Sequence, residues 1–177
     1  MGDILPRRTM SEEAQLTDTE DFQERLSEVQ TLLARHRLVE DLVHRQEGPR
    51  HDLVEDIVQR QHLNELQHML EPMHPADIAY ILEALPLEDR LIAWDLVKAE
   101  RDGDILLEVS DAVRETLIES MERTELVAAA ETLDADELAD LAPDLPQGVI
   151  DDVLRSLSVE EREHLRAAMS YPEESVG

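Results

Sequence analysis

The sequence contains no cysteine, which excludes disulfide bonds, thiol catalysis and thiolate metal sites. Aromatic residues make up only 2% of the chain, which disfavours β-sandwiches because these depend on aromatic and β-branched strands. No apolar stretch approaches the roughly 20 residues that span a bilayer, and no signal-peptide pattern opens the chain. These absences predict a soluble, cytoplasmic polypeptide without direct membrane insertion.

Basic residues are also scarce, because 16 lysines and arginines stand against 43 aspartates and glutamates. The resulting formal net charge of -27 repels nucleic-acid phosphates and anionic membrane surfaces, so neither is an expected partner. The expected partners are cations, basic proteins, or another acidic surface bridged by a metal ion.

Hydrophobic residues, mostly Leu, Ile, Val and Ala, make up 42% of the 177 residues. That content is too high for a disordered chain, and the length suits one domain with a helical appendage. Aliphatic residues without aromatics favour thin helix–helix packing. We therefore predict an all-α fold.

The N-terminal third shows two patterns. Residues 1–18 are polar and lack periodicity, which predicts a disordered lead. Residues 19–61 form a predicted helical extension, a long helix followed by an αα-hairpin, because the similar segments LVEDLVHRQ (38–46) and LVEDIVQRQ (53–61) flank a Gly-Pro break. In the long helix, four apolar residues follow one face: Phe22, Leu26, Val29 and Leu33. The pattern fails beyond His36, which favours docking on the domain over a coiled-coil dimer.

From residue 62 to 170, helix-start signals recur at a fixed interval. An apolar residue precedes a helix-starting residue every 24 positions, at Leu85-Pro86, Val109-Ser110, Leu133-Asp134 and Leu157-Ser158. A second series, at positions 74, 98, 122 and 146, lies midway. Short helices paired in this way are typical of α-solenoids. The predicted fold is therefore a right-handed superhelical stack of short helices with an N-terminal helical extension.

Residues 124–154 contain nine carboxylates and no lysine or arginine. Asp134 and Glu137 have the spacing of a capping box. Asp136 and Asp140 then lie four residues apart on the outer face of the same helix, where like charges repel. Such pairs are most often solvated; alternatively a hard cation neutralises them, and oxygen ligands favour Mg²⁺ or Ca²⁺. Water or a second acidic surface must then complete the coordination shell.

Two Glu-x-x-His pairs, Glu65–His68 and Glu161–His164, have the spacing used in di-iron helical bundles. Those bundles need long facing helices, whereas the helices here are interrupted about every 12 residues. Solvated or packing histidines are therefore the favoured interpretation. We predict no enzymatic activity, because no HExxH, P-loop, dinucleotide fingerprint or nucleophile elbow occurs. His74 is expected to start a helix, and Trp94 to pack in the core.

Three segments carry a family resemblance: HPADIAYILEALP (74–86), DELADLAPDLP (136–146) and YPEESVG (171–177). In this order and spacing they resemble the intracellular N-terminal domain of the MgtE magnesium transporters. Residues 62–170 correspond to the helical domain and 171–177 to the start of a linker, where Val176 replaces the usual alanine. The preceding residues resemble an extension seen in part of the family. The resemblance implies an excised regulatory domain, since the family's linker leads into CBS domains and then a transmembrane pore.

The resemblance also implies a ligand and a site. In the family, intracellular Mg²⁺ binds between the N domain and the CBS domains and favours the closed pore. Asp136 and Asp140 match the family's acidic D-D-L-A-D pair, with Glu137 in place of its second aspartate. Asp104, in DGDILLEV, falls where the family has an acidic residue on a preceding helix. Also implied are weak Mg²⁺ binding by the isolated domain, CBS domains of the same full-length transporter as partners, a homodimeric full-length protein and a position on the cytoplasmic side of the bacterial inner membrane.

Two functions therefore compete. The first is a Mg²⁺-sensing gating domain, and the second is a metal-independent helical adaptor that grips a protein partner through the solenoid groove.

Overall fold

The computed structural model describes residues 10–43 and 51–170, and all regular structure within these ranges is helical. This confirms the predicted all-α fold. The chain divides into two compact units, Met1–Leu66 and Gln67–Gly177. No helix in the described ranges combines the length and the apolar character needed to cross a bilayer.

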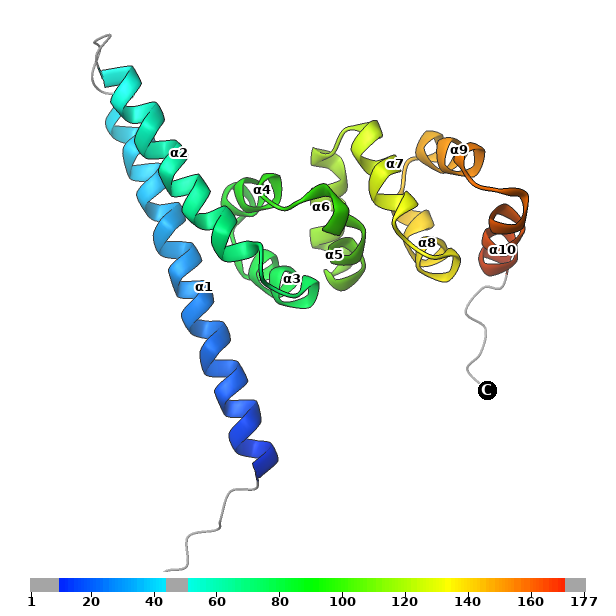
Figure 1. Ribbon diagram of the computed structural model, residues 1–177, viewed down its shortest axis with the longest axis horizontal. Helices are drawn as coiled ribbons and strands as arrows, with labels where there is room; N and C mark the ends of the chain where they lie inside the picture. Colours follow the sequence, from blue (N-terminus) through cyan, green and yellow to red (C-terminus); the bar gives the residue numbers. More distant parts are fainter. Residues whose placement is uncertain (1–9, 44–50, 171–177) are drawn as a thin grey trace, which may run out of the picture. The chain divides into compact units, whose positions relative to one another are not determined.

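The first unit consists of α1 (Met10–Val43) and most of α2 (His51–Leu70), which run in opposite directions (Figure 1). The sequence predicts a lead through residue 18, but α1 already begins at Met10, so the helix includes part of that polar segment. A single long α1 also forms the first arm of the hairpin, and no separate short helix precedes α2. The Gly-Pro break at 48–49 lies outside the described residues.

The predicted apolar face of α1 is confirmed in the first unit. Val29 and Leu33 are buried, and Phe22 and Leu26 are half-buried. The face continues to His36, whose side chain is also buried and whose Nε2 lies 3.6 Å from Glu40 Oε1.

The second unit is a series of short helices that start about every twelve residues. Both predicted series of helix starts are confirmed, since residues at positions 74, 86, 98, 110, 122, 134 and 146 are N-caps and α10 begins just after Ser158. The helices are α3 (Pro75–Ala84), α4 (Leu87–Asp95), η1 (Ala99–Arg101), α5 (Asp102–Glu108), α6 (Asp111–Ser120), α7 (Arg123–Glu131), α8 (Ala135–Leu141), η2 (Ala142–Asp144), α9 (Gln147–Ser156) and α10 (Val159–Ser170).

These helices pack in two rows, as expected for stacked helix pairs. In one row α3 contacts α5, the η1–α5 segment contacts α7, and α7 contacts α9. In the other row α4 contacts α6 and α8 contacts α10, while α5 contacts α8 across the rows. Partners within a row come from successive pairs, so each pair buries its apolar face against its neighbours. The right-handed sense of the stack remains a prediction.

One glycine permits a close approach between two helices of a row. A Cβ atom at Gly103 would lie 2.7 Å from the carbonyl oxygen of Ala129 and 2.9 Å from Thr132 Oγ1. Because these distances are too short for any larger side chain, the start of α5 can pack directly on the end of α7.

A repeated arginine joins the two helices of a pair. Arg90, Arg114 and Arg162 each donate from Nε to the carbonyl oxygen eight residues earlier, with distances of 2.8, 2.6 and 2.9 Å. Each also donates from Nη2 to the carbonyl oxygen five residues earlier. Since the last carbonyl groups of a helix have no intrahelical donor, this arginine clip satisfies them with a charged group.

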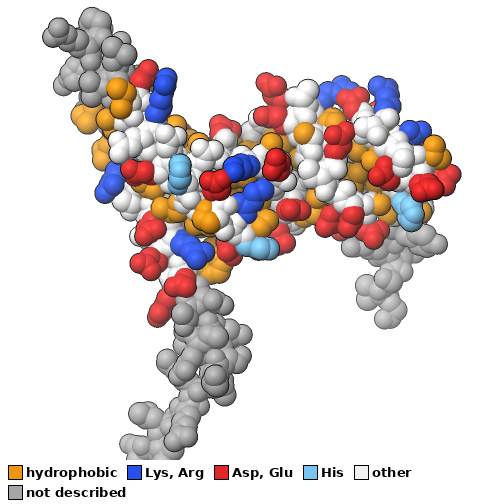
Figure 2. Space-filling model, viewed as in Figure 1, with side chains coloured by type: hydrophobic (Ala, Val, Ile, Leu, Met, Phe, Trp, Pro, Cys, Tyr) orange, Lys and Arg blue, Asp and Glu red, His pale blue; other side chains and the backbone are white. Residues whose placement is uncertain are grey.

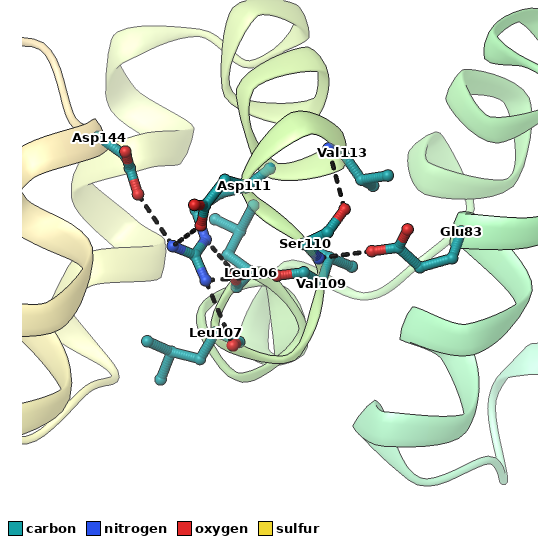
Figure 3. Close-up of polar contacts among 9 residues, drawn as sticks. Glu83, Leu106, Leu107, Val109, Ser110, Asp111, Val113 and Asp144 are labelled. Carbon is teal, nitrogen blue, oxygen red and sulfur yellow. Dashed lines mark hydrogen bonds and ion pairs between the residues drawn. The ribbon is translucent and has the colours of Figure 1, made fainter.

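The clip also reaches the next pair. Arg114 Nη1 donates to Asp144 at 2.9 Å, and Arg90 Nη1 donates to Thr116 Oγ1 at 3.4 Å. Figure 3 shows Asp144, Asp111, Leu106 and Leu107 arranged around one such guanidinium group. One side chain thereby fixes both the turn within its own pair and the contact with the following pair.

The third pair lacks the clip. Its corresponding residue is Leu138, which is buried, so no arginine at this position donates to the end of α7. Thr132 donates from both its backbone N–H and its hydroxyl group to the carbonyl oxygen of Ala129, the latter at 2.7 Å. This exchange of arginine for leucine removes a cation from the middle of the unit.

The clip predicts a large stability effect for Arg114→Ala. Its side chain is only 13% exposed and makes hydrogen bonds to carbonyl groups and to Asp144. We expect the free energy of unfolding to fall by about 2–3 kcal/mol, measured by urea denaturation followed by circular dichroism. Arg155→Ala is the control, because Arg155 is 79% exposed and its ion pair with Asp152 is long, at 3.5 Å; its loss should stay below about 0.5 kcal/mol. Equal losses in the two variants would contradict the clip.

Candidate functional site

The cation-free interval, residues 124–154, is partly neutralised by arginines from outside it. Arg114 pairs with Asp144, and Arg123 donates from Nε to Asp152 at 2.7 Å. The hydrogen bond from Arg123 holds the pKa of Asp152 below its usual value. These two carboxylates therefore already have arginine partners within the fold.

Three further carboxylates of the interval cap helix starts. Asp134 accepts the backbone N–H groups of residues 136 and 137, and Glu137 accepts the N–H of Asp134 at 3.0 Å, so the predicted capping box is confirmed. Glu125 accepts the N–H of Glu122 at 2.7 Å in the same way. Charged caps stabilise a helix N-terminus, which gives these three acids a structural role.

Four carboxylates remain after this assignment, Glu131, Asp136, Asp140 and Asp151, and two of them, Asp136 and Asp140, are the predicted site residues. Both are exposed on α8, and within the described residues no hydrogen bond or ion pair reaches either carboxylate. The capping box fixes the start of α8, and the burial of Leu138 and Leu141 fixes its inner face. The two aspartates are therefore held four residues apart on an outer surface.

Asp104 lies on α5, which contacts α8, and it is also exposed without an ion-pair partner among the described residues. Figure 2 shows acidic side chains gathered over the α5 and α8 part of the second unit. Across the described ranges, however, no group of three or more acidic or histidine side chains is placed to hold a metal ion. The three predicted residues thus offer exposed oxygen donors but no complete coordination shell.

In the described part of the chain, neither Glu-x-x-His pair belongs to a group of three or more acidic or histidine side chains placed to hold a metal ion. Glu161 accepts the backbone N–H of Ser158 at 2.8 Å and is a helix cap. His74, as predicted, caps a helix: its Nδ1 accepts the N–H of Ala76 at 3.2 Å.

The structure contains a second acidic feature that sequence reasoning missed. A cavity of about 270 Å³ lies between α4, η1 and α7, and its lining includes three acidic residues: Asp95, Asp102 and Glu125. We call it the Trp94 cavity, because Trp94 also lines it. Trp94 is only 5% exposed, which confirms the prediction that it packs in the core.

Asp102 is the unusual member of this group. It is 9% exposed, and within the described residues no hydrogen bond or ion pair reaches its carboxylate. Burial, followed by the negative charge of Glu125, raises the pKa of Asp102 to about 7. The same causes raise the pKa of the more exposed Asp95. No sequence pattern indicates this residue, because its burial depends on how η1 and α7 pack.

Part of the chain matches the model of a known family. Residues 73–174 match the model of the family described as the MgtE intracellular N domain. No protein of curated function matches the sequence.

A solved structure with a similar fold is described as the soluble part of a magnesium transporter. The TM-score is 0.51 at 17% sequence identity, and the match covers 70% of this chain and 49% of that chain. The chain therefore spans about half the length of that structure, and at this identity the likeness supports the fold.

Asp102 makes the stability of the protein depend on pH. Its carboxyl group binds a proton more tightly in the folded chain than at the ordinary pKa of 3.8, so its contribution to the free energy of unfolding is full below pH 4 and is lost as the pH rises through 7. Asp102→Asn removes this loss. We expect the variant to exceed the parent by about 2 kcal/mol at pH 8 and to equal it near pH 4, measured by urea denaturation.

Asp104→Asn is the matched control, because Asp104 belongs to the same helix but is exposed. It should change the free energy of unfolding by less than about 0.5 kcal/mol at either pH. A gain for Asp102→Asn that is the same at pH 4 and pH 8 would exclude the buried charge as its cause.

Proposed function

The chain belongs to the family of MgtE intracellular N domains, and from this premise we propose that it is the cytosolic regulatory domain of a magnesium transporter. In this proposal the domain senses intracellular Mg²⁺ by sharing acidic metal sites with downstream CBS domains, which favours the closed pore. The observation that carries it is the pair Asp136 and Asp140, exposed and unpaired in an interval without cations.

The geometry of this surface supports a metal site shared with a second surface over a metal site formed by this domain alone. Two carboxylates of α8, with Asp104 on the neighbouring α5, supply oxygen donors suited to Mg²⁺ but too few for its six-coordinate shell. A facing acidic surface and water must provide the rest, so the isolated domain should bind Mg²⁺ weakly.

Electrostatics then links closure to the concentration of the ion. Two acidic surfaces repel each other over about 8 Å at physiological ionic strength. A divalent ion between them replaces repulsion with bridging, and because it binds only the closed arrangement well, it shifts the population toward that arrangement. We further propose a homodimeric full-length protein, with this domain on the cytoplasmic side of the bacterial inner membrane and without enzymatic activity.

A second candidate function is a metal-independent adaptor. An open groove of about 1000 Å³ lies along α6, α7 and α9, with apolar residues such as Ile118 and Leu145 in its walls and exposed acids such as Glu115 and Glu119 beside them. Such a groove suits a basic, partly apolar segment of a partner protein.

The test compares this chain with a longer protein that continues through the downstream CBS domains. We expect Mg²⁺ to compact the longer protein, measured as a decrease in its radius of gyration by small-angle X-ray scattering, and to leave this chain unchanged at the same concentrations. In the longer protein, the double substitution Asp136→Asn with Asp140→Asn should raise the Mg²⁺ concentration for half-compaction roughly tenfold. This change corresponds to a loss of about 1.4 kcal/mol in the free energy of Mg²⁺ binding.

The matched control is Glu115→Gln with Glu119→Gln. These two acids are also exposed, also four residues apart on one helix, and their replacement changes the net charge equally. The control should keep the half-compaction concentration within about twofold of the parent. Compaction that is identical in the parent and the Asp136/Asp140 variant would favour the adaptor.

A further inference from the structure

The Trp94 cavity is negatively charged and contains no compensating cation of its own. Its lining consists of Trp94, Asp95, Val97, Ala99, Asp102, Ser120, Met121 and Glu125, without lysine, arginine or histidine. The basic residues nearest in sequence are committed elsewhere: Lys98 pairs with Glu71, Arg101 donates to the carbonyl oxygens of Glu71 and Met73, and Arg123 pairs with Asp152. No side chain of the lining therefore balances the negative charge that the cavity carries when Asp102 is ionised.

Asp102 supplies an independent indication of a ligand. The residue is only 9% exposed, lines the cavity, and has no hydrogen-bond or ion-pair partner among the described residues. A buried carboxylate without a partner is costly, and in native structures such a group usually meets water, an ion or a ligand.

The arrangement favours a broad organic cation over a metal ion. No three acidic or histidine side chains in the described residues are close enough together to hold one metal. The cavity, at about 270 Å³, is several times the roughly 30 Å³ that a water molecule occupies in the liquid. A guanidinium group is planar, weakly hydrated, pairs with carboxylates through several N–H donors and is attracted to indole rings.

We propose that the Trp94 cavity is a binding site for a guanidinium group, held by the carboxylates of Asp102 and Glu125 beside the indole of Trp94. This site is separate from the Asp136/Asp140 surface and does not rest on the proposed magnesium function. The guanidinium belongs either to a small molecule or to an arginine side chain of a partner.

Trp94 provides the readout, because it is the only tryptophan in the chain. We expect methylguanidinium chloride to change the fluorescence of the protein saturably, with a Kd of about 1–10 mM. Urea, which has the same planar shape without the charge, and NaCl at equal ionic strength should give no saturable change.

The variants separate the site from general charge effects. Asp102→Asn and Glu125→Gln should each weaken binding at least about tenfold, and Gln can still accept the N–H of Glu122 at the helix start. Asp111→Asn is the matched control, since Asp111 is 96% exposed and outside the cavity; it should bind as the parent does. Circular dichroism melting curves confirm that each variant is folded.

The pH dependence gives a second measurement. Methylguanidinium stays charged throughout the neutral range, whereas Asp102 ionises near pH 7 in a cavity that it shares with Asp95 and Glu125. Binding should therefore strengthen between pH 6 and pH 8 in the parent and stay constant in Asp102→Asn.

Several results would overturn the proposal. These are an unchanged fluorescence signal up to 50 mM methylguanidinium (about five times the weakest expected Kd), an equal response to urea, or unaltered binding by Asp102→Asn. An equal saturable response to MgCl₂ at matched ionic strength would instead identify a divalent-cation site. If none of these results is found, the source of the guanidinium can be determined. Tighter binding of an arginine-containing peptide than of free L-arginine indicates a protein partner, and the reverse indicates a small molecule.

Discussion

The second unit depends on satisfying the carbonyl groups at the ends of very short helices. A helix of about ten residues leaves its last four carbonyls without intrahelical donors, which is a large fraction of its backbone. The arginine clips at Arg90, Arg114 and Arg162 donate to these groups with a guanidinium that is permanently charged. Because a core with so few aromatic residues buries little area per helix, these directed hydrogen bonds specify the angle of each turn where packing alone would not.

The missing clip in the third pair connects the fold to the proposed function. Leu138 occupies the position of the arginine, so no guanidinium from this position donates to the end of the preceding helix, where the Thr132 hydroxyl bonds the carbonyl oxygen of Ala129. A guanidinium at position 138 would lie on the same short helix as Asp136 and Asp140. Its replacement by a buried leucine keeps the stack packed while it leaves those aspartates without an internal counterion. The leucine at position 138 thus affects both the packing of the third pair and the charge of the surface around Asp136 and Asp140.

The sequence predicts local features of this chain well, because they depend on neighbouring residues. Helix starts at Ser110 and Asp134 follow from their capping side chains, and the box between Asp134 and Glu137 follows from spacing alone. The sequence does not predict that α1 begins at Met10, because the polar residues before residue 19 carry no apolar periodicity although a helix can extend through them.

Features that join distant residues could not be predicted in this way. The clip was visible in the sequence only as arginines 24 or 48 residues apart, and its carbonyl acceptors carry no side-chain signal. Asp102 is buried next to Gly103, whose close approach involves a backbone oxygen of α7. The pairing of Asp144 and Asp152 with arginines was likewise hidden, so the unpaired aspartates could be separated from structural ones only in three dimensions.

The repeated geometry also restricts how such arrays can change in length. The guanidinium of the clip must meet carbonyl oxygens eight and five positions upstream, so a single-residue insertion between them would break the clip. Gain or loss of a whole 24-residue module keeps every acceptor in register. Such arrays are therefore expected to change in length only by whole modules.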